Sequence, residues 1–172
     1  MLVFLVGACG VGKSTLCETL RKLEASADYI LLQSDSSPIP SQEEMEQEFG
    51  DWGTWQYRNT IKWIDRMVAY AEEQTVIWDG QANLDFITKE MANRQITNYR
   101  IVLIECAEEE MIRRLIEERK QAYLAHQDQK NWRNFLHRQA EEKGAYIIDT
   151  TNISPKEVAK QLLVYLEGTS TS

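Results

Sequence analysis

The chain has 172 residues, of which 43% are hydrophobic and 27% are charged, and its formal net charge is −8. This length favours one domain with a sizeable core, and the acidic balance argues against broad nucleic-acid binding, which needs a basic surface. Three cysteines without CxxC spacing exclude a disulfide framework and a zinc site.

Five short segments rich in β-branched or aromatic residues predict strands, at residues 1–6, 29–32, 75–78, 99–105 and 145–148. None of them alternates cleanly between apolar and polar residues, which is typical of strands that are buried on both faces of a parallel sheet. The first segment is too short for a signal peptide or a membrane span. We therefore expect a cytoplasmic protein without a membrane-spanning segment.

Helical patterns fill the intervals between these strands. Apolar residues at helical spacing predict helices after residue 15 and over 57–71, 108–129, 132–140 and 155–167. The last helix begins with the capping box of Ser154 and Glu157 and stops at Gly168. Strands that alternate with helices predict an α/β domain, whose ligands bind beyond the carboxyl ends of the strands.

The stretch GACGVGKS, which starts at Gly7, matches the pattern G-x-x-x-x-G-K-[ST] and lies between an apolar strand and a helix. Its glycines let successive N–H groups turn toward a phosphate, and the N-terminus of the next helix adds positive charge. We expect Lys13 to reach the outer phosphates as a catalytic residue, and the Ser14 hydroxyl to bind Mg²⁺. The residues predicted to bind the nucleotide are Gly7, Ala8, Cys9, Gly10, Val11, Gly12, Lys13, Ser14 and Thr15.

On this loop and the order of its elements, the chain resembles the small P-loop kinases, which include nucleotide, nucleoside, gluconate and shikimate kinases and chloramphenicol-type phosphotransferases. The helix at Asn131-Trp132 and the strand end at Ile148-Asp149-Thr150 also resemble those of uncharacterised bacterial nucleotide-binding ATPases. The resemblance implies a three-layer α/β/α P-loop NTPase fold, with a five-stranded parallel sheet of order 2-3-1-4-5. It further implies an acceptor-binding helical region at about 36–74 and a short lid at about 113–133. From the length and the Thr/Ser run at its end, we expect one domain over residues 1–168 and a disordered tail at 169–172.

Asp35 follows the second predicted strand. In gluconate-kinase-like and chloramphenicol-phosphotransferase-like enzymes, an aspartate at this place lies near the hydroxyl that accepts the phosphate, and Asp35 matches it. Its carboxylate could orient that hydroxyl and take its proton, which would make Asp35 both a catalytic and an acceptor-binding residue. The alternative is a turn residue, because the sequence Ser-Asp-Ser-Ser-Pro also favours a turn.

The stretch from 47 to 63 is dense in aromatic residues and contains Trp52, Trp55 and Trp63. This region usually supplies the acceptor pocket in the family that the chain resembles. Aromatic rings there could stack on a planar acceptor, and Arg58 could hold an anionic group. Packing of the helix onto the sheet is the alternative, and it explains Trp63 better than it explains the loop at 52–55.

The third predicted strand ends in Asp79-Gly80, a pair that nucleotide kinases carry here, but the proline and arginine that follow it in those enzymes are missing. This difference argues against an ordinary nucleoside monophosphate kinase. If the third strand neighbours the first, Asp79 could complement Ser14 as a ligand of Mg²⁺, and a simple turn is the alternative. Gln81 could bind an amide or a hydroxyl group of the acceptor.

The segment 108–129 is dense in charge, and most of its charged residues would form a solvated helix face. Arg119 differs because it falls seven residues after Ile112 and four after Leu115, so it would share their apolar face. Lid arginines of small P-loop kinases stabilise the charge on the transferring phosphate, and we therefore expect Arg119 to be catalytic. The other candidates are Arg113, Arg114 and Arg133.

These features predict an ATP- and Mg²⁺-dependent phosphotransferase that moves the γ-phosphate to a small-molecule acceptor: a nucleoside, a nucleotide or another hydroxyl compound. Its partners would be ATP and that acceptor, with no nucleic acid and no membrane. Residues 150–152 could border the nucleotide base, or could only prepare the capping box at Ser154. The alternative function is a nucleotide-binding regulatory or interaction module with little turnover, which the missing proline and arginine favour.

Overall fold

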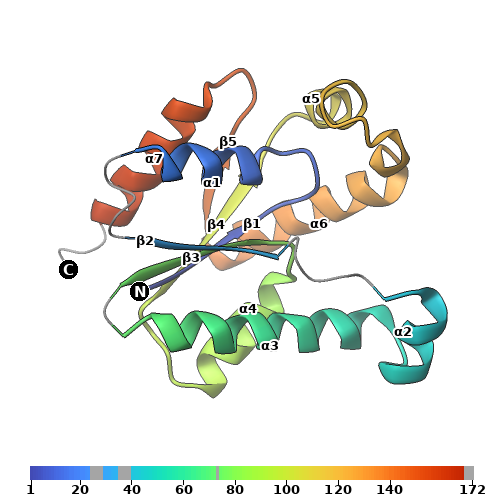
Figure 1. The fold of residues 1–172 in the computed structure, drawn as a ribbon, viewed down its shortest axis with the longest axis vertical. Coiled ribbons are helices and arrows are strands. Elements are labelled where there is room, and N and C mark those ends of the chain that lie inside the picture. Colours follow the sequence, from blue (N-terminus) through green and yellow to red (C-terminus); the bar gives the residue numbers. More distant parts are fainter. Residues whose placement is uncertain (24–28, 35–39, 73, 169–172) are drawn as a thin grey trace.

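A parallel sheet lies at the centre of the fold (Figure 1). The computed structural model describes residues 1–23, 29–34, 40–72 and 74–168; Asp35 and the tail at 169–172 lie outside these ranges. Within them the strands are β1 (Leu2–Val6), β2 (Tyr29–Gln33), β3 (Thr75–Gly80), β4 (Tyr99–Glu105) and β5 (Tyr146–Asp149). All neighbouring strands pair in parallel in the order β2-β3-β1-β4-β5, which confirms the predicted sheet.

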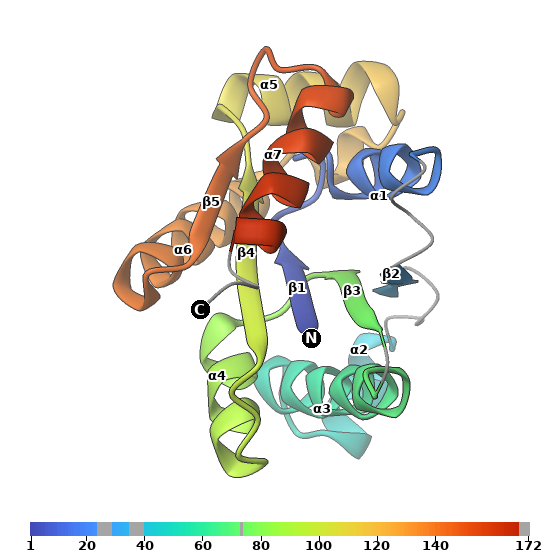
Figure 2. The same ribbon diagram turned by 90° about the vertical axis from the view of Figure 1, so that its left-hand side faces the viewer.

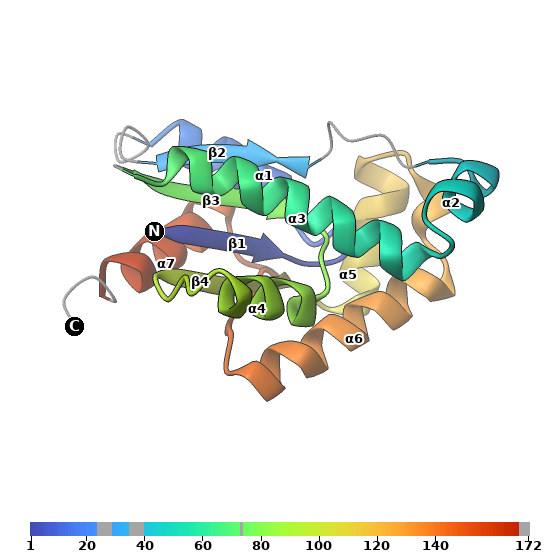
Figure 3. The ribbon, with the colours of Figure 1, turned by 90° about the horizontal axis from the view of Figure 1, so that it is seen from below.

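Helices cover both faces of this sheet, which gives the three layers that the sequence predicts. One face carries α1 (Lys13–Arg21) and α7 (Pro155–Gly168), and the other carries α3 (Trp52–Tyr70), α4 (Leu84–Asn93) and α6 (Gln127–Lys143). Figure 2 shows α1 and α7 on one side of the sheet and α3 and α4 on the other. In Figure 3, the arrow of β1 points toward α2 (Gln42–Glu48) and α5 (Glu108–Arg113), which lie beyond the carboxyl end of the sheet.

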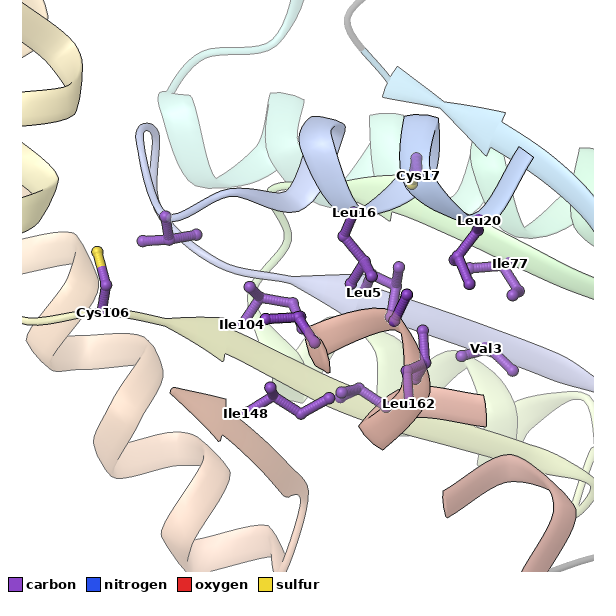
Figure 4. Close-up of a cluster of buried hydrophobic side chains, with 14 of the residues drawn as sticks. Val3, Leu5, Leu16, Cys17, Leu20, Ile77, Ile104, Cys106, Ile148 and Leu162 are labelled. Atoms are coloured by element: carbon purple, nitrogen blue, oxygen red, sulfur yellow. The ribbon is translucent and has the colours of Figure 1, made fainter. Parts of the chain in front are cut away.

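The central strand β1 is buried along its whole length, as its unbroken apolar sequence predicts. Its side chains alternate between the two layers because successive residues of a strand point to opposite faces. Val3 and Leu5 belong to the cluster that contains Leu16 of α1 and Leu162 of α7, and Figure 4 shows these side chains together. Phe4 instead packs in the cluster under α3, α4 and α6. The strand that leads into the glycine loop is therefore fixed from both sides.

The segment predicted as one helix over 108–129 is broken, and this prediction is wrong. After α5 the chain makes a π-helical turn (Arg114–Glu118) and a 3₁₀ turn (Ala122–Leu124), and α6 then begins at Gln127. The break occurs at Lys120, whose φ of 55° is left-handed. Helices commonly end at a left-handed residue, but that residue is usually glycine, so a lysine in this place gives no signal in the sequence.

Two helices were missed, although both carry local signals. The short helix α2 begins with a capping box, in which Ser41 and Glu44 bond each other's backbone N–H groups. The N-terminus of α4 is capped by Asn83, and its buried residues Leu84, Ile87 and Met91 follow helical spacing. In the residues that the structure describes, none of the helices has both the length and the apolar character that crossing a membrane requires.

Candidate active site

The glycine loop, residues 7–15, leaves β1 and enters α1 through backbone conformations that few side chains allow. Gly10 and Gly12 have φ angles of 81° and 103°, in the left-handed region. A Cβ atom at Gly7 would lie 2.3 Å from the carbonyl oxygen of Ile104, and one at Gly10 would lie 2.9 Å from Cγ of Leu115. The loop therefore depends on glycine for its shape and for its close approach to β4 and the π-helical turn.

Lys13 is folded along this loop. Its ammonium group donates hydrogen bonds to the carbonyl oxygens of Gly7 and Ala8, both at 3.0 Å, and the residue is only 8% exposed. Lys13 is also the first residue of α1, so its charge lies at the positive N-terminal end of that helix. The loop thus gathers backbone N–H groups, a helix end and an ammonium group, a combination that suits the phosphates of a nucleotide.

Ser14 and Asp79 come together at the carboxyl edge of the sheet. Asp79 lies on β3 opposite Leu5 of β1, and its carboxylate accepts a 3.3 Å hydrogen bond from the Ser14 hydroxyl. The Asp79 carboxylate is buried. The pKa of the nearby Cys17 thiol is raised to about 12, first by the burial of that thiol and next by the negative charge of Asp79. Among the described residues, no group of three or more histidine, cysteine or acidic side chains could hold a metal ion. Two oxygen ligands fit Mg²⁺, since this ion usually completes its shell with phosphates and water.

A first pocket of about 430 Å³ opens beside the glycine loop. Its walls come from the loop, the start of α1, the segment from Glu110 to Arg119 and the chain after β5. Thr150, Ile153, Pro155 and Val158 form the side that follows β5, so one wall of the pocket is largely apolar. Of residues 150–152, for which the sequence predicts base contacts, Thr150 lines this pocket.

Arg114 ties the walls of the first pocket together. Its guanidinium donates to the hydroxyl of Thr150 at 2.9 Å, to the carbonyl of Thr150 at 3.0 Å and to Glu110 at 2.8 Å. The Thr150 hydroxyl in turn donates to the carbonyl of Val11 in the glycine loop at 2.8 Å. Hydrogen bonds from Arg113 first, and then from Arg114, lower the pKa of Glu110 to about 2. Arg114 therefore positions the loop rather than standing free to meet a phosphate.

A second pocket of about 770 Å³ lies on the other side of Lys13, between the start of α3, the end of β3 and residues 119–132. Gln81 lines it and donates a 3.1 Å hydrogen bond to the Cys9 sulfur, while the side-chain oxygen of Gln129 accepts from the Cys9 N–H at 3.4 Å. Gln81, for which the sequence predicts an acceptor contact, thus lies on the wall of the second pocket.

Trp52 and Trp55 also line the second pocket, but they belong to the first turn of α3 and not to a loop. Asp51 caps this helix by accepting from the Thr54 N–H. Gln56 and Asn59 join the two tryptophans on the pocket wall, and sequence reasoning missed both. The positions 52, 55, 56 and 59 follow the i, i+3, i+4, i+7 spacing of one helix face, which is a signal that could have found them.

Arg58 does not line either pocket. It is exposed, and its guanidinium carbon lies 5.6 Å from the ring centroid of Phe49. Since residues two apart on a helix point in different directions, Arg58 faces away from the side that carries Gln56. The structure therefore does not bring this predicted acceptor ligand to the second pocket. Asp35, the other predicted acceptor ligand, lies outside the described residues.

Three residues line both pockets: Lys13, Ser14 and Arg119. The sequence placed Arg119 on the apolar face with Leu115, but Leu115 is buried and Arg119 is exposed. The π-helical turn explains the difference, because the Arg119 N–H bonds the carbonyl five residues back and the helical spacing is lost. The Arg119 guanidinium makes no ion pair with another described residue, whereas Arg113 pairs with Glu110, Glu117 and Glu118.

Arg133 also lies away from both pockets. Its guanidinium donates a 2.8 Å hydrogen bond to the carbonyl of Cys106 and a second bond, of 3.0 Å, to Asn134. Of the four arginines considered for the lid, Arg119 is therefore the one that lies at the junction of the pockets.

The fold is similar to that of solved kinases at low sequence identity. A shikimate kinase from Acinetobacter baumannii in complex with shikimate is 17% identical, with a TM-score of 0.60 over 99% of this chain and 95% of that chain. A deoxyadenosine kinase from M. mycoides is 13% identical, with a TM-score of 0.57 over 98% and 100%. A shikimate kinase from Aquifex aeolicus is 22% identical, with a TM-score of 0.56 over 99% and 98%.

Comparison with curated proteins gives no match. A protein family described as an AAA domain matches residues 2–167. Because this match spans almost the whole chain, and because the sheet order and the glycine loop agree with the solved kinases, the protein belongs to this AAA domain family and has the fold of the small P-loop kinases.

Proposed function

We propose that the protein is a phosphotransferase that moves the γ-phosphate of ATP, with Mg²⁺, to a hydroxyl group of a small molecule. One observation carries this proposal: two pockets meet at Lys13, Ser14 and Arg119. A nucleotide in the first pocket would place its last phosphate at this junction, and an acceptor in the second pocket would approach the same point. The second pocket therefore favours a phosphotransferase over a protein that binds only a nucleotide.

The residues at the junction have complementary roles. Backbone N–H groups of the glycine loop and the Lys13 ammonium would hold the phosphates, and Arg119 would neutralise the charge that develops during transfer. Ser14 and Asp79 would hold Mg²⁺, which when bound neutralises charge on the phosphate oxygens. Catalysis would consist mainly of positioning and charge stabilisation. Asp35 remains the proposed acceptor of the hydroxyl proton, on the resemblance of the sequence alone.

Similar proteins support this function. Three solved structures with a similar fold are by name two shikimate kinases and a deoxyadenosine kinase, and one of them contains shikimate. Their identities of 13–22% carry the fold and not the substrate. The acceptor must therefore be argued from the second pocket of this chain.

ADP release with Mg·ATP, measured against a panel of hydroxyl acceptors, tests the proposal. We expect one class of acceptor to raise ADP release, and we expect the Lys13→Ala variant to abolish the increase. ATP binding without any acceptor-dependent turnover would contradict the proposal and would favour a nucleotide-binding module. Thermal unfolding with and without ATP shows in the same samples whether the nucleotide binds.

A further inference from the structure

The second pocket is lined mainly by neutral groups. Four aromatic side chains contribute to it: Trp52, Trp55, Tyr123 and Trp132. Five amide side chains join them: Gln56, Asn59, Gln81, Gln121 and Gln129. Amides offer both hydrogen-bond donors and acceptors without charge, and aromatic rings offer flat apolar surface.

Several of these neutral groups have no partner in the described part of the chain. Gln56 is 8% exposed, and its side-chain amide forms no hydrogen bond with another described residue. Gln121 Oε1 and Trp132 Nε1 are also unpaired, but these two atoms are fully buried and do not face the open space of the pocket. The indole N–H groups of Trp63 and Trp78 are also unpaired, but they lie in the core under α3 and α4 and do not line the pocket. Gln56 keeps a small accessible area on the pocket wall, and because polar side chains as buried as this one are usually paired, its amide points to a ligand with a matching donor and acceptor.

The positive charge of the second pocket is confined to its junction with the first pocket. Its lysine and arginine are Lys13 and Arg119, which both belong to the junction with the first pocket. The stretches outside the described residues contain no lysine, arginine or histidine, so they cannot supply a cation either. Nearby Lys130 is paired with Glu108 at 2.7 Å. Away from this junction, a carboxylate or phosphate of the acceptor would therefore lie among neutral groups and carboxylates, where its charge would be poorly stabilised.

We propose that the acceptor is an uncharged molecule that combines a planar, hydrogen-bonding ring with a free hydroxyl group, which is the chemistry of a nucleoside. The ring would contact the tryptophans of the wall, and its polar edge would pair with the amides of Gln56 and Asn59. In the reaction, the acceptor oxygen bonds to the γ-phosphorus, the bond from that phosphorus to the ADP oxygen breaks, and the hydroxyl proton is released. This inference rests on the proposed function, which it refines by selecting one acceptor class.

Paired ligands that differ only in charge test this proposal. Purine and pyrimidine nucleosides, and each corresponding 5′-monophosphate, are titrated calorimetrically into the protein saturated with Mg·ADP, with shikimate as a carboxylate ligand and kanamycin as a polycation. We expect at least one nucleoside to bind about tenfold or more tightly than its own monophosphate, because the phosphate adds a charge without a partner. The proposal is overturned if no nucleoside binds, or if a charged ligand binds as tightly as the best nucleoside.

Variants of the pocket wall supply the second part of the test. Gln56→Leu and Asn59→Leu each remove an amide of similar size, and we expect each to weaken nucleoside binding about tenfold while leaving Mg·ADP binding unchanged. Gln161→Leu is the matched control, because this glutamine is exposed on α7 and lines neither pocket. Nucleoside binding that both wall variants leave unchanged also overturns the proposal.

The acceptor class and the kinase activity can fail separately. ADP release that depends on Lys13 and is driven only by a nucleoside monophosphate or by shikimate would keep the proposed kinase and overturn the uncharged acceptor. Nucleoside binding that depends on Gln56, without any ADP release, would support the neutral pocket and contradict the kinase.

Discussion

The hydroxyl of Ser14 donates a 3.3 Å hydrogen bond to the carboxylate of Asp79, which is 65 residues away in the sequence. The contact exists because β1 and β3 are parallel neighbours, so that the loop after one strand meets the last residues of the other. Asp79 is only 4% exposed, so its negative charge is buried directly beside the glycine loop. This pair is the part of the site that a divalent cation fits.

The Ser14–Asp79 pair predicts a specific metal dependence. We expect Asp79→Asn to raise the Mg²⁺ concentration needed for half-maximal ADP release about tenfold or more, because the replacement removes a charged oxygen ligand or its water partner. Metal-free nucleotide binding should change little, since Lys13 and the loop N–H groups are untouched. A titration of activity with Mg²⁺ measures the effect, and an unchanged midpoint would show that Asp79 does not serve the metal.

Arg119 is the arginine whose position at the junction of the pockets suits catalysis. We expect Arg119→Gln to lower kcat about a hundredfold, with a much smaller change in nucleotide affinity, because the guanidinium would act on charge that develops in the transition state. Single-turnover kinetics at saturating ATP measures the first quantity, and calorimetry with ADP measures the second.

A matched control for Arg119 is available at the next position. Lys120 is exposed, lines neither pocket and has a left-handed φ of 55°, which asparagine tolerates well. Lys120→Asn therefore removes a neighbouring charge without strain and should keep kcat. Equal losses in both variants would mean that the general charge of the lid matters rather than the Arg119 side chain.

The shape of the glycine loop predicts a loss of stability at Gly10. Gly10→Ala would place a Cβ 2.9 Å from Leu115 Cγ in a residue with a φ of 81°. We expect a loss of about 1–3 kcal/mol in the free energy of unfolding, together with weaker nucleotide binding. Urea denaturation measures the first effect. Gly168→Ala is the control, because a Cβ there meets nothing within 4 Å, and equal stability of the two variants would contradict the role assigned to the loop.

Glu110 predicts a pH dependence of stability. Because hydrogen bonds from Arg113 and Arg114 lower the pKa of Glu110 from 4.5 to about 2, the unfolded chain binds the proton more tightly than the folded protein does. The stabilisation is therefore complete above a pH of about 4.5 and is lost as the pH falls toward 2.

The variant Glu110→Gln isolates this contribution. Urea midpoints of the variant should fall below those of the wild type at neutral pH, and the difference should shrink between pH 4.5 and 2. Glu109→Gln is the control, since Glu109 is exposed and forms no ion pair with another described residue. A difference that stays constant over this pH range would exclude ionisation of Glu110 as its cause.

The glycine loop was predictable from the sequence because its residues are consecutive in the chain. Its glycines, Lys13 and Ser14 form one continuous pattern that can be read without knowledge of the contacts that Ile104, Leu115 and Thr150 later make with the loop. The five strands were recognisable from their apolar composition. The resemblance to the small P-loop kinases predicted that β1 and β3 are neighbours, and this pairing brings Asp79 to Ser14.

The lining of the second pocket was decided by tertiary structure. Its wall combines the start of α3, the end of β3 and the chain around α6, and only the packing of these elements selects which side chains face the pocket. The rotation of α3 admits Gln56 and Asn59 and turns Arg58 outward, and the π-helical turn changes the helical spacing so that Arg119 reaches the junction. Sequence alone therefore determined the residues of the glycine loop, because they follow one another along the chain. The fold decided the character of the second pocket, because side chains from distant segments share one space only after those segments have packed.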